Sequence, residues 1–227
     1  MNNKMLMGFF IMLTLCFLFS ACDSNKESIE ESKKKLSIEE ANKLILATQD
    51  FSHSGNMEND LLEITPSDIW DKTKLQLFKN SSLETFIVTN QKAVHIGIGF
   101  GGFGVTSAVP YDVNKDGTLD VVYAYSFGSG IHRSVISWID LKSFTEHHVG
   151  DMPERKDFRN YDLILKIEGN EIVVNRIADM DESKINFVSL QTYPTEKEIE
   201  YMTLEKVGVL VGENSELYNK QLLLHSS

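Results

Sequence analysis

The chain has 227 residues, a formal net charge of −11 and two cysteines. An acidic surface repels the phosphates of nucleic acids and anionic lipid headgroups, so the charge argues against nucleic-acid binding and against membrane attachment through basic patches. The length suits one domain with a sizeable core, with at most a small appendage.

Residues 1–21 have the pattern of a secretory signal peptide. Lys4 precedes a nearly unbroken apolar run over residues 5–19, which is too short to span a bilayer comfortably. The sequence Phe19-Ser20-Ala21-Cys22 at its end resembles a bacterial lipoprotein signal, although that family usually has Leu at the position of Phe19. The resemblance implies that Cys22 is acylated, with palmitate as a typical group, and anchors the protein to the bacterial cell membrane. The alternative is an ordinary signal peptide followed by a chance cysteine.

Both cysteines belong to this N-terminal region. Cleavage before Cys22 would remove Cys16, and acylation would use Cys22, so no thiol is left for a disulfide, a zinc site or a nucleophile. Residues 22–36 are polar, charged and free of aromatic side chains, which predicts a flexible tether. Residues 37–227 are predicted to form a single β-rich domain that begins with helices.

Two short helices are expected first. Ser37 and Glu40 form a capping-box pattern ahead of apolar residues at helical spacing, which predicts a helix over residues 38–48. Thr65 is a candidate cap before Pro66, and this arrangement predicts a second helix over residues 66–79.

From residue 83 the pattern indicates strands joined by short links. Asn90-Gln91-Lys92 and Glu168-Gly169-Asn170 are hairpin signals. The fold class is therefore mainly β (α+β), with an antiparallel meander or sandwich-like sheet after the two helices. The expected strands are 83–89, 93–98, 105–111, 119–127, 134–141, 144–149, 161–167, 171–177, 185–192 and 201–211.

Residues 112–120, with the sequence DVNKDGTLD, carry the most specific chemistry. Oxygen-bearing side chains stand at positions 1, 3, 5 and 9, and Gly117 at position 6 permits a sharp turn. A hard cation such as calcium takes six to eight oxygen ligands, which alternate residues of a tight loop can supply. The loop is not an EF-hand, because Tyr123 stands where that motif needs a glutamate and because strands flank it.

The segment from Phe103 to about Tyr125 resembles the calcium loop of integrin-type FG-GAP repeats, with a Phe-Gly start, the acidic loop and an apolar strand. That family builds propellers from several repeats, whereas this chain has one such loop, since residues 179–183 lack the glycine and are predicted to be a turn. The alternative is a calcium-free Asx turn closed by side-chain hydrogen bonds. The resemblance implies a calcium ion held by side chains of Asp112, Asn114, Asp116 and Asp120 and by the backbone carbonyl of Thr118.

Two glycine-rich segments flank the loop in sequence. Residues 97–104 match a dinucleotide-binding pattern by letter, but a strand-like segment follows where that pattern needs a helix, so a glycine-rich turn is expected. Residues 128–134 form the second turn, and the two turns are expected to share an edge of the sheet. The candidate ligand contacts there are His132, Arg133 and Ser134, which would bind an anionic group or form a surface turn.

The sequence favours a non-catalytic binding or envelope-associated module outside the cytoplasm, in the periplasm or on the cell surface. Its partner would be an envelope protein or a glycan. The alternative is an extracytoplasmic hydrolase with its site at turns 97–104 and 128–134, although no Gly-x-Ser-x-Gly elbow supports it. The adjacent His147 and His148 would point to opposite faces of a strand, which is poor geometry for a shared metal.

Overall fold

The computed structural model describes residues 34–48, 61–97, 102–149, 158–159, 162–181, 183–185 and 196–210. The chain divides into two compact units, Met1–Lys35 and Leu36–Ser227, and every helix and strand below belongs to the second unit. The signal peptide, Cys22, most of the tether and nearly all of the predicted strand 185–192 lie outside the described residues. Among the described residues, no helix has the length and apolar character needed to cross a membrane.

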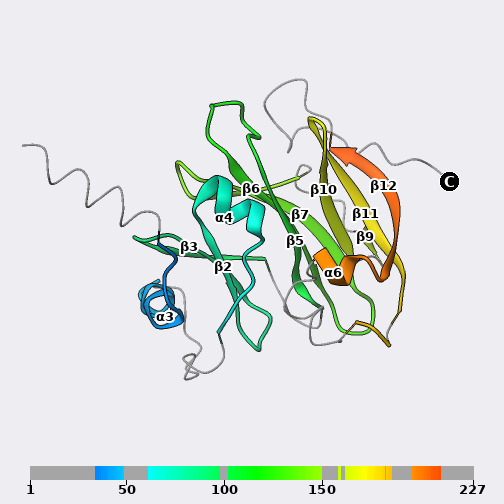
Figure 1. Cartoon of the computed structure of the whole chain (residues 1–227), viewed down its shortest axis with the longest axis horizontal. Coiled ribbons are helices and arrows are strands. Elements are labelled where there is room, and N and C mark those ends of the chain that lie inside the picture. Colours follow the sequence, from blue (N-terminus) through cyan, green and yellow to red (C-terminus); the bar gives the residue numbers. More distant parts are fainter. Residues whose placement is uncertain are drawn as a thin grey trace, which may run out of the picture. The chain divides into compact units, whose positions relative to one another are not determined.

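The prediction of a mainly β fold is confirmed: the described strands form three antiparallel sheets (Figure 1). Apart from β9, which pairs with β7, neighbouring strands within each sheet follow one another in the chain, which is the meander that the short links predicted. The first sheet contains β1 (Leu62–Glu63), β2 (Gln76–Lys79), β3 (Thr85–Val88) and β4 (Ala93–Ile96). The second sheet contains β5 (Gly104–Tyr111), β6 (Asp120–Phe127), β7 (Arg133–Asp140) and β8 (Thr145–His148), with β9 (Phe158–Arg159) also paired to β7. The third sheet contains β10 (Leu163–Glu168), β11 (Glu171–Met180) and β12 (Met202–Leu210).

The first helix, α3 (Ile38–Leu46), begins where the sequence predicts and ends before the predicted residue 48, with Ala47 as its C-cap. The Ser37 hydroxyl accepts the Glu40 N–H at 3.2 Å, and the Glu40 carboxylate accepts the Ser37 N–H at 2.7 Å, which completes the capping box. Ala41 and Ile45 on its inner face pack into a cluster with residues of β2 and β3. A short helix, α6 (Glu196–Ile199), precedes β12 and was not expected.

The second predicted helix, 66–79, is wrong over its second half. Helix α4 (Ser67–Thr73) ends at Lys74, which has a left-handed φ of 58°, and residues 76–79 form β2. Thr65 does not cap the helix, because its hydroxyl accepts the N–H of Leu77 at 2.9 Å. Leu77 and Phe78 enter different apolar clusters, so the apolar residues of this short run follow a strand period rather than a helical one.

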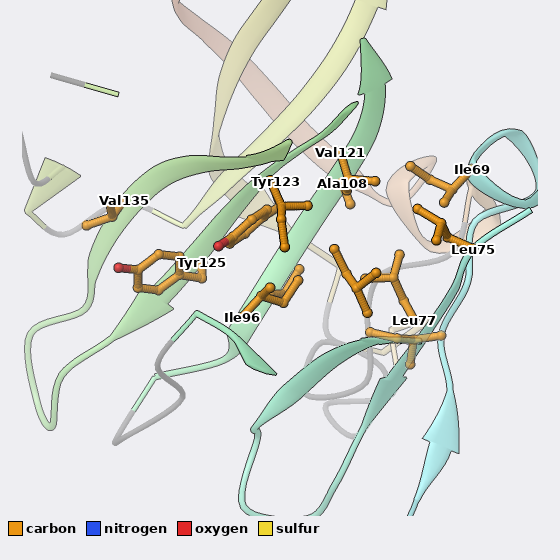
Figure 2. Packing of buried hydrophobic residues seen from close by; sticks show 13 residues of the cluster. Ile69, Leu75, Leu77, Ile96, Ala108, Val121, Tyr123, Tyr125 and Val135 are labelled. Atoms are coloured by element: carbon orange, nitrogen blue, oxygen red, sulfur yellow. The ribbon is translucent and has the colours of Figure 1, made fainter. Parts of the chain in front are cut away.

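Strand β6 of the second sheet is buried on both faces. Val121, Tyr123 and Tyr125 pack against the first sheet and α4, in the cluster that Figure 2 shows. Val122 and Ala124 point the other way, into a cluster with β10, β11 and β12 of the third sheet. This double burial explains why β6 reads as a continuous apolar run without polar alternation.

A bulge in β5 connects the second and third sheets. The register against β6 shifts between Val105 and Ser107, where two side chains turn toward β10. The Thr106 hydroxyl donates to the Leu163 carbonyl at 2.8 Å, and the Ser107 hydroxyl accepts the Leu165 N–H at 2.8 Å. Side chains of β5 thus provide hydrogen bonds to the backbone of β10.

Candidate functional site

The loop between β5 and β6 is closed by hydrogen bonds from its own backbone. The Asp112 carboxylate accepts the N–H groups of Asp116 at 3.1 Å and Gly117 at 3.0 Å. The Asn114 side-chain oxygen accepts the Asp116 N–H at 3.0 Å, and the Asp116 carboxylate accepts the Thr118 N–H at 2.8 Å. These are the Asx turns of the calcium-free alternative, and they gather the side-chain oxygens of positions 1, 3 and 5 around one turn.

The fourth acidic residue of the loop, Asp120, is 1% exposed. Its carboxylate accepts the Val113 N–H at 3.1 Å and the Leu141 N–H at 3.3 Å, and so joins the loop to the β7–β8 turn. The pKa of Asp120 is raised to about 6, mainly by burial and in smaller part by the charges of Asp140 and Asp116, while the two backbone hydrogen bonds oppose the rise.

A positive group already lies at the edge of the loop. The Lys142 ammonium is 2.7 Å from the Asp116 carboxylate and donates to the Asp116 carbonyl at 3.3 Å. The hydrogen bond from Lys142 holds the pKa of Asp116 below its usual value. A side chain thus supplies positive charge to the most exposed carboxylate of the loop.

The donor chemistry of the loop fits calcium. All the predicted ligands are oxygens, and a carboxylate or amide oxygen that accepts one N–H keeps a second lone pair. The mutual repulsion of Asp116, Asp120 and Asp140 would be relieved by a cation. Within the described ranges, however, no group of three or more His, Cys, Asp or Glu residues is placed to hold a metal ion, so calcium stays a proposal.

The described residues of the two glycine-rich segments, 97 and 102–104 in the first and 128–134 in the second, lie near the end of β6 opposite to the loop, as the sequence predicts; residues 98–101 lie outside the described residues. A side chain on Gly102 would lie 2.5 Å from the Ser126 carbonyl oxygen, so the backbone at Gly102 touches the backbone at the end of β6 directly. Gly104 has a φ of +64°, and a side chain there would meet the Leu83 carbonyl oxygen of the β2–β3 turn at under 3.0 Å. Both glycines are therefore required by close backbone approach.

Lys79, at the end of β2, bonds to the backbone at residues 103 and 105, next to the first glycine-rich segment. Its side chain is buried, and its ammonium donates to the carbonyls of Phe103 at 2.7 Å and Val105 at 2.8 Å. Burial lowers the pKa of Lys79 to about 7. Nothing in the local sequence around Lys79 indicates this role, because its partners are 24 and 26 residues away.

His132, predicted as a ligand contact, pairs with Asp162 ahead of β10. Its Nδ1 lies 3.1 and 3.2 Å from the two carboxylate oxygens, and the ring packs edge-on against Phe103 with 4.8 Å between centroids. Ser134 is fully buried in β7 opposite Phe158, and Arg133 lies opposite Arg159 of β9. The three predicted residues therefore do not converge on one exposed point.

A row of polar side chains across β6, β7 and β8 was missed by sequence reasoning. Tyr123 lies opposite Ser137, and Ser137 lies opposite His148, whose Nδ1 is 2.7 Å from the Ser137 hydroxyl oxygen. The Tyr123 phenol donates to the carboxylate of Glu146. His147 stacks on Trp138 at 4.3 Å, whereas His148 contacts Ser137, so the two histidines do point to opposite faces. The two-residue period of β8 places Glu146 and His148 on one face, but only the register of β6, β7 and β8 shows which residues lie opposite them.

No family model, no curated protein and no solved structure matches this chain in comparisons of sequence and fold.

Proposed function

We propose that this chain is a non-catalytic binding module outside the cytoplasm, attached to a bacterial membrane through acylated Cys22. The partner class is an envelope protein or glycan, and the 112–120 loop is a structural calcium element. The observation that carries the choice of a binding module over a hydrolase is the packing at the glycine-rich turns. There Lys79 is bound to two backbone carbonyls, His132 is paired with Asp162, and Ser134 is fully buried.

These contacts account for the polar residues of the turns without a reaction. An active site needs a nucleophile and a base that reach a substrate and each other. Ser134 is 0% exposed, and the His132 ring is edge-packed on Phe103. The described part of the turns therefore holds β5, β6 and the β2–β3 turn together.

In this proposal calcium would be held by the side chains of Asp112, Asn114, Asp116 and Asp120 and by the Thr118 carbonyl. The ion would supply positive charge to a cluster of carboxylates and stiffen the connection between β5 and β6. The chain's own part is to orient the oxygens, which the N–H groups of residues 113–118 do.

The anchor is tested by growing a bacterial host that expresses the full chain with an alkyne-labelled fatty acid. The native chain and Cys16→Ala, the matched control, should both be labelled and sediment with membranes. Cys22→Ala should carry no label. Label on Cys22→Ala, or none on the native chain, would contradict the lipid anchor.

The loop is tested by thermal melting of the full chain in calcium and in chelator. A ligand that binds the folded state alone raises the melting temperature with its concentration. We expect this rise in the native chain and in Asp179→Ala, a control at an acidic residue near the end of β11, and its loss in Asp116→Ala. Equal melting temperatures in calcium and chelator would dispose of the calcium site.

The absence of catalysis is tested with chromogenic ester, phosphoester and glycoside substrates. The expected result is no turnover above buffer by the full chain. Turnover that His132→Gln removes and His147→Gln retains would favour the hydrolase alternative.

A further inference from the structure

Helix α3 is attached to the first sheet by few groups. Of its nine residues, only Ala41, Asn42 and Ile45 are buried, whereas Ile38 and Leu46 are exposed. A helix of this length is not stable by itself in water, so α3 depends on what it packs against. The apolar side chains of Ala41 and Ile45 provide that packing, in a cluster with residues of β2, β3 and β4.

A side chain of β2 holds the chain just ahead of α3. The Gln76 side chain accepts the N–H of Leu36 at 2.7 Å and donates to the carbonyl of Leu36 at 3.1 Å. Gln76 is 2% exposed, and its strand is paired with β1 on one side and β3 on the other. Both backbone groups of Leu36, the first residue of the second compact unit, are therefore bonded to one buried side chain.

The inner face of α3 also carries a polar group that opposes packing. Asn42 is 4% exposed, and its side-chain oxygen has no hydrogen-bond partner among the described residues. A buried acceptor that loses water without gaining a donor destabilises the packed state. Water can reach this oxygen when α3 leaves the sheet, so Asn42 favours the open state.

Strand β6 differs from α3 in its burial and its pairing. Seven of its eight residues are buried, and it is paired with β5 on one side and β7 on the other. Within the described ranges, no residue of α3 belongs to either apolar cluster that β6 enters. Segments with few buried apolar side chains open at a lower free energy than core strands, so α3 and β6 should open separately.

We propose that residues 36–46 form a strap on the first sheet, which opens as a unit while the three sheets stay folded. Opening breaks the two bonds of Gln76, lets water reach the Asn42 oxygen and uncovers the apolar side chains of Phe78 and Phe86. This opening depends neither on lipidation nor on the calcium loop.

The strap directly follows the segment predicted to be a tether. An extended residue spans about 3.3 Å, against about 1.5 Å in a helix, so an open strap gives the anchored domain a longer reach. This consequence rests on the proposed anchor at Cys22. Fatty-acid labelling tests the anchor and the exchange experiment below tests the opening, so a failure of one is distinguishable from a failure of the other.

The test is amide hydrogen exchange of the full chain, followed by mass spectrometry on peptides from α3 and β6. We expect the hydrogen-bonded amides of α3 to exchange at least tenfold faster than those of β6, because a local opening requires less free energy than global unfolding. Equal exchange in the two elements would overturn the proposal, since α3 would then open only together with the sheets.

Two substitutions should shift the exchange of α3 in opposite directions. Gln76→Leu removes both bonds to Leu36 and should raise the rate about fivefold, the factor that one hydrogen bond of ordinary strength supplies. Asn42→Ala removes the buried oxygen and should lower the rate by more than about threefold, which the helix propensity of alanine alone supplies. Gln91→Leu, at an exposed glutamine of the β3–β4 turn, is the matched control and should leave the rate unchanged.

Ile172→Val tests whether the sheets stay folded while the strap opens. Ile172 is fully buried in the cluster that packs the third sheet against β6, so its truncation weakens a core that strap opening leaves intact. The exchange of β6 should rise about fivefold, and that of α3 should not change. A parallel rise in α3 would overturn the proposal.

Unchanged exchange of α3 in folded Gln76→Leu would also overturn the proposal, as would faster exchange in Asn42→Ala. Near-UV circular dichroism reports whether each variant keeps its packing. If Gln76→Leu does not fold, Gln76→Glu takes its place, because it keeps an acceptor for the Leu36 N–H and loses the donor to the Leu36 carbonyl. The same rise in exchange is expected, and its absence would have the same meaning.

Discussion

The two ends of β6 are built in opposite ways. The end at Asp120 is closed by a loop whose main hydrogen bonds join residues two to seven positions apart. The end at Phe127 is held by contacts between distant segments, such as Lys79 with Phe103 and His132 with Asp162. The first kind of structure is determined by a short stretch of sequence, whereas the second forms only when the sheets have assembled. The two ends should therefore respond differently to the same substitution.

The largest difference is expected for alanine at a left-handed glycine. Gly104 and Gly117 both have positive φ, but a side chain on Gly104 would meet the Leu83 carbonyl, while one on Gly117 would meet nothing within 4 Å. Gly104→Ala should destabilise the fold by roughly 3 kcal/mol or more, because backbone must move. Gly117→Ala should cost about 1 kcal/mol for the φ alone. Urea unfolding compares them, and equal losses would refute the contrast.

A second difference is the pH dependence that Lys79 imposes. Its pKa is about 7 in the folded state and about 10.4 in an unfolded chain, so between these values the unfolded state binds more protons. The free energy of unfolding should then rise with pH from about 7 to 10, by up to ~1.4 kcal/mol per pH unit. Lys79→Met should flatten this rise, and Lys166→Met, at an exposed lysine of β10, should keep it. Parallel curves for native protein and Lys79→Met would show that the buried ammonium is not the cause.

The smallest effect belongs to Asp120. Its folded pKa of about 6 lies above the unfolded value of about 3.9, so the folded state binds more protons between them. Stability from this group is fully present below about pH 4 and is lost as the pH rises through 6. Asp120→Asn should remove that slope and cost about 1 kcal/mol, because one buried N–H loses its acceptor. The measurement is urea unfolding at pH 4, 5, 6 and 7, in chelator. If the pH dependence of the free energy of unfolding persists in Asp120→Asn, another group causes it.

Local signals predicted local structure well. The Ser37–Glu40 capping box gave the start of α3, and Glu168-Gly169-Asn170 gave the hairpin between β10 and β11. The prediction of helix after Thr73 was wrong, because α4 ends at Lys74 in the left-handed conformation, which the preferences of lysine do not indicate. The turn predicted over 179–183 also begins later, since β11 continues to Met180 through its pairing with β12. Both errors arise where pairing between strands overrides the preferences of a short segment.

The candidate sites divide along the same line. The 112–120 loop was recognised from spacing because its hydrogen bonds stay within the segment. The role of Lys79 and the row from Tyr123 to His148 were not, because each depends on which residues face one another across sheets and strands. The described parts of the two glycine-rich segments were correctly predicted to lie at one edge of the sheet, because a straight β6 separates that edge from the 112–120 loop at its other end. The contacts of His132 and Ser134 could not be predicted, because they depend on Asp162, which precedes β10, and on the pairing of β7 with β9.

The hydroxyl groups of Thr106 and Ser107 have a consequence for how the molecule opens. They bond the backbone of β10 in place of a strand ladder, so the hydrogen bonds between β5 and β10 break through side-chain rotation. Each neighbouring sheet keeps its own ladder when this happens. Separating the third sheet from the second therefore requires these side-chain bonds to break and the apolar cluster that packs β10, β11 and β12 against β6 to be exposed to water.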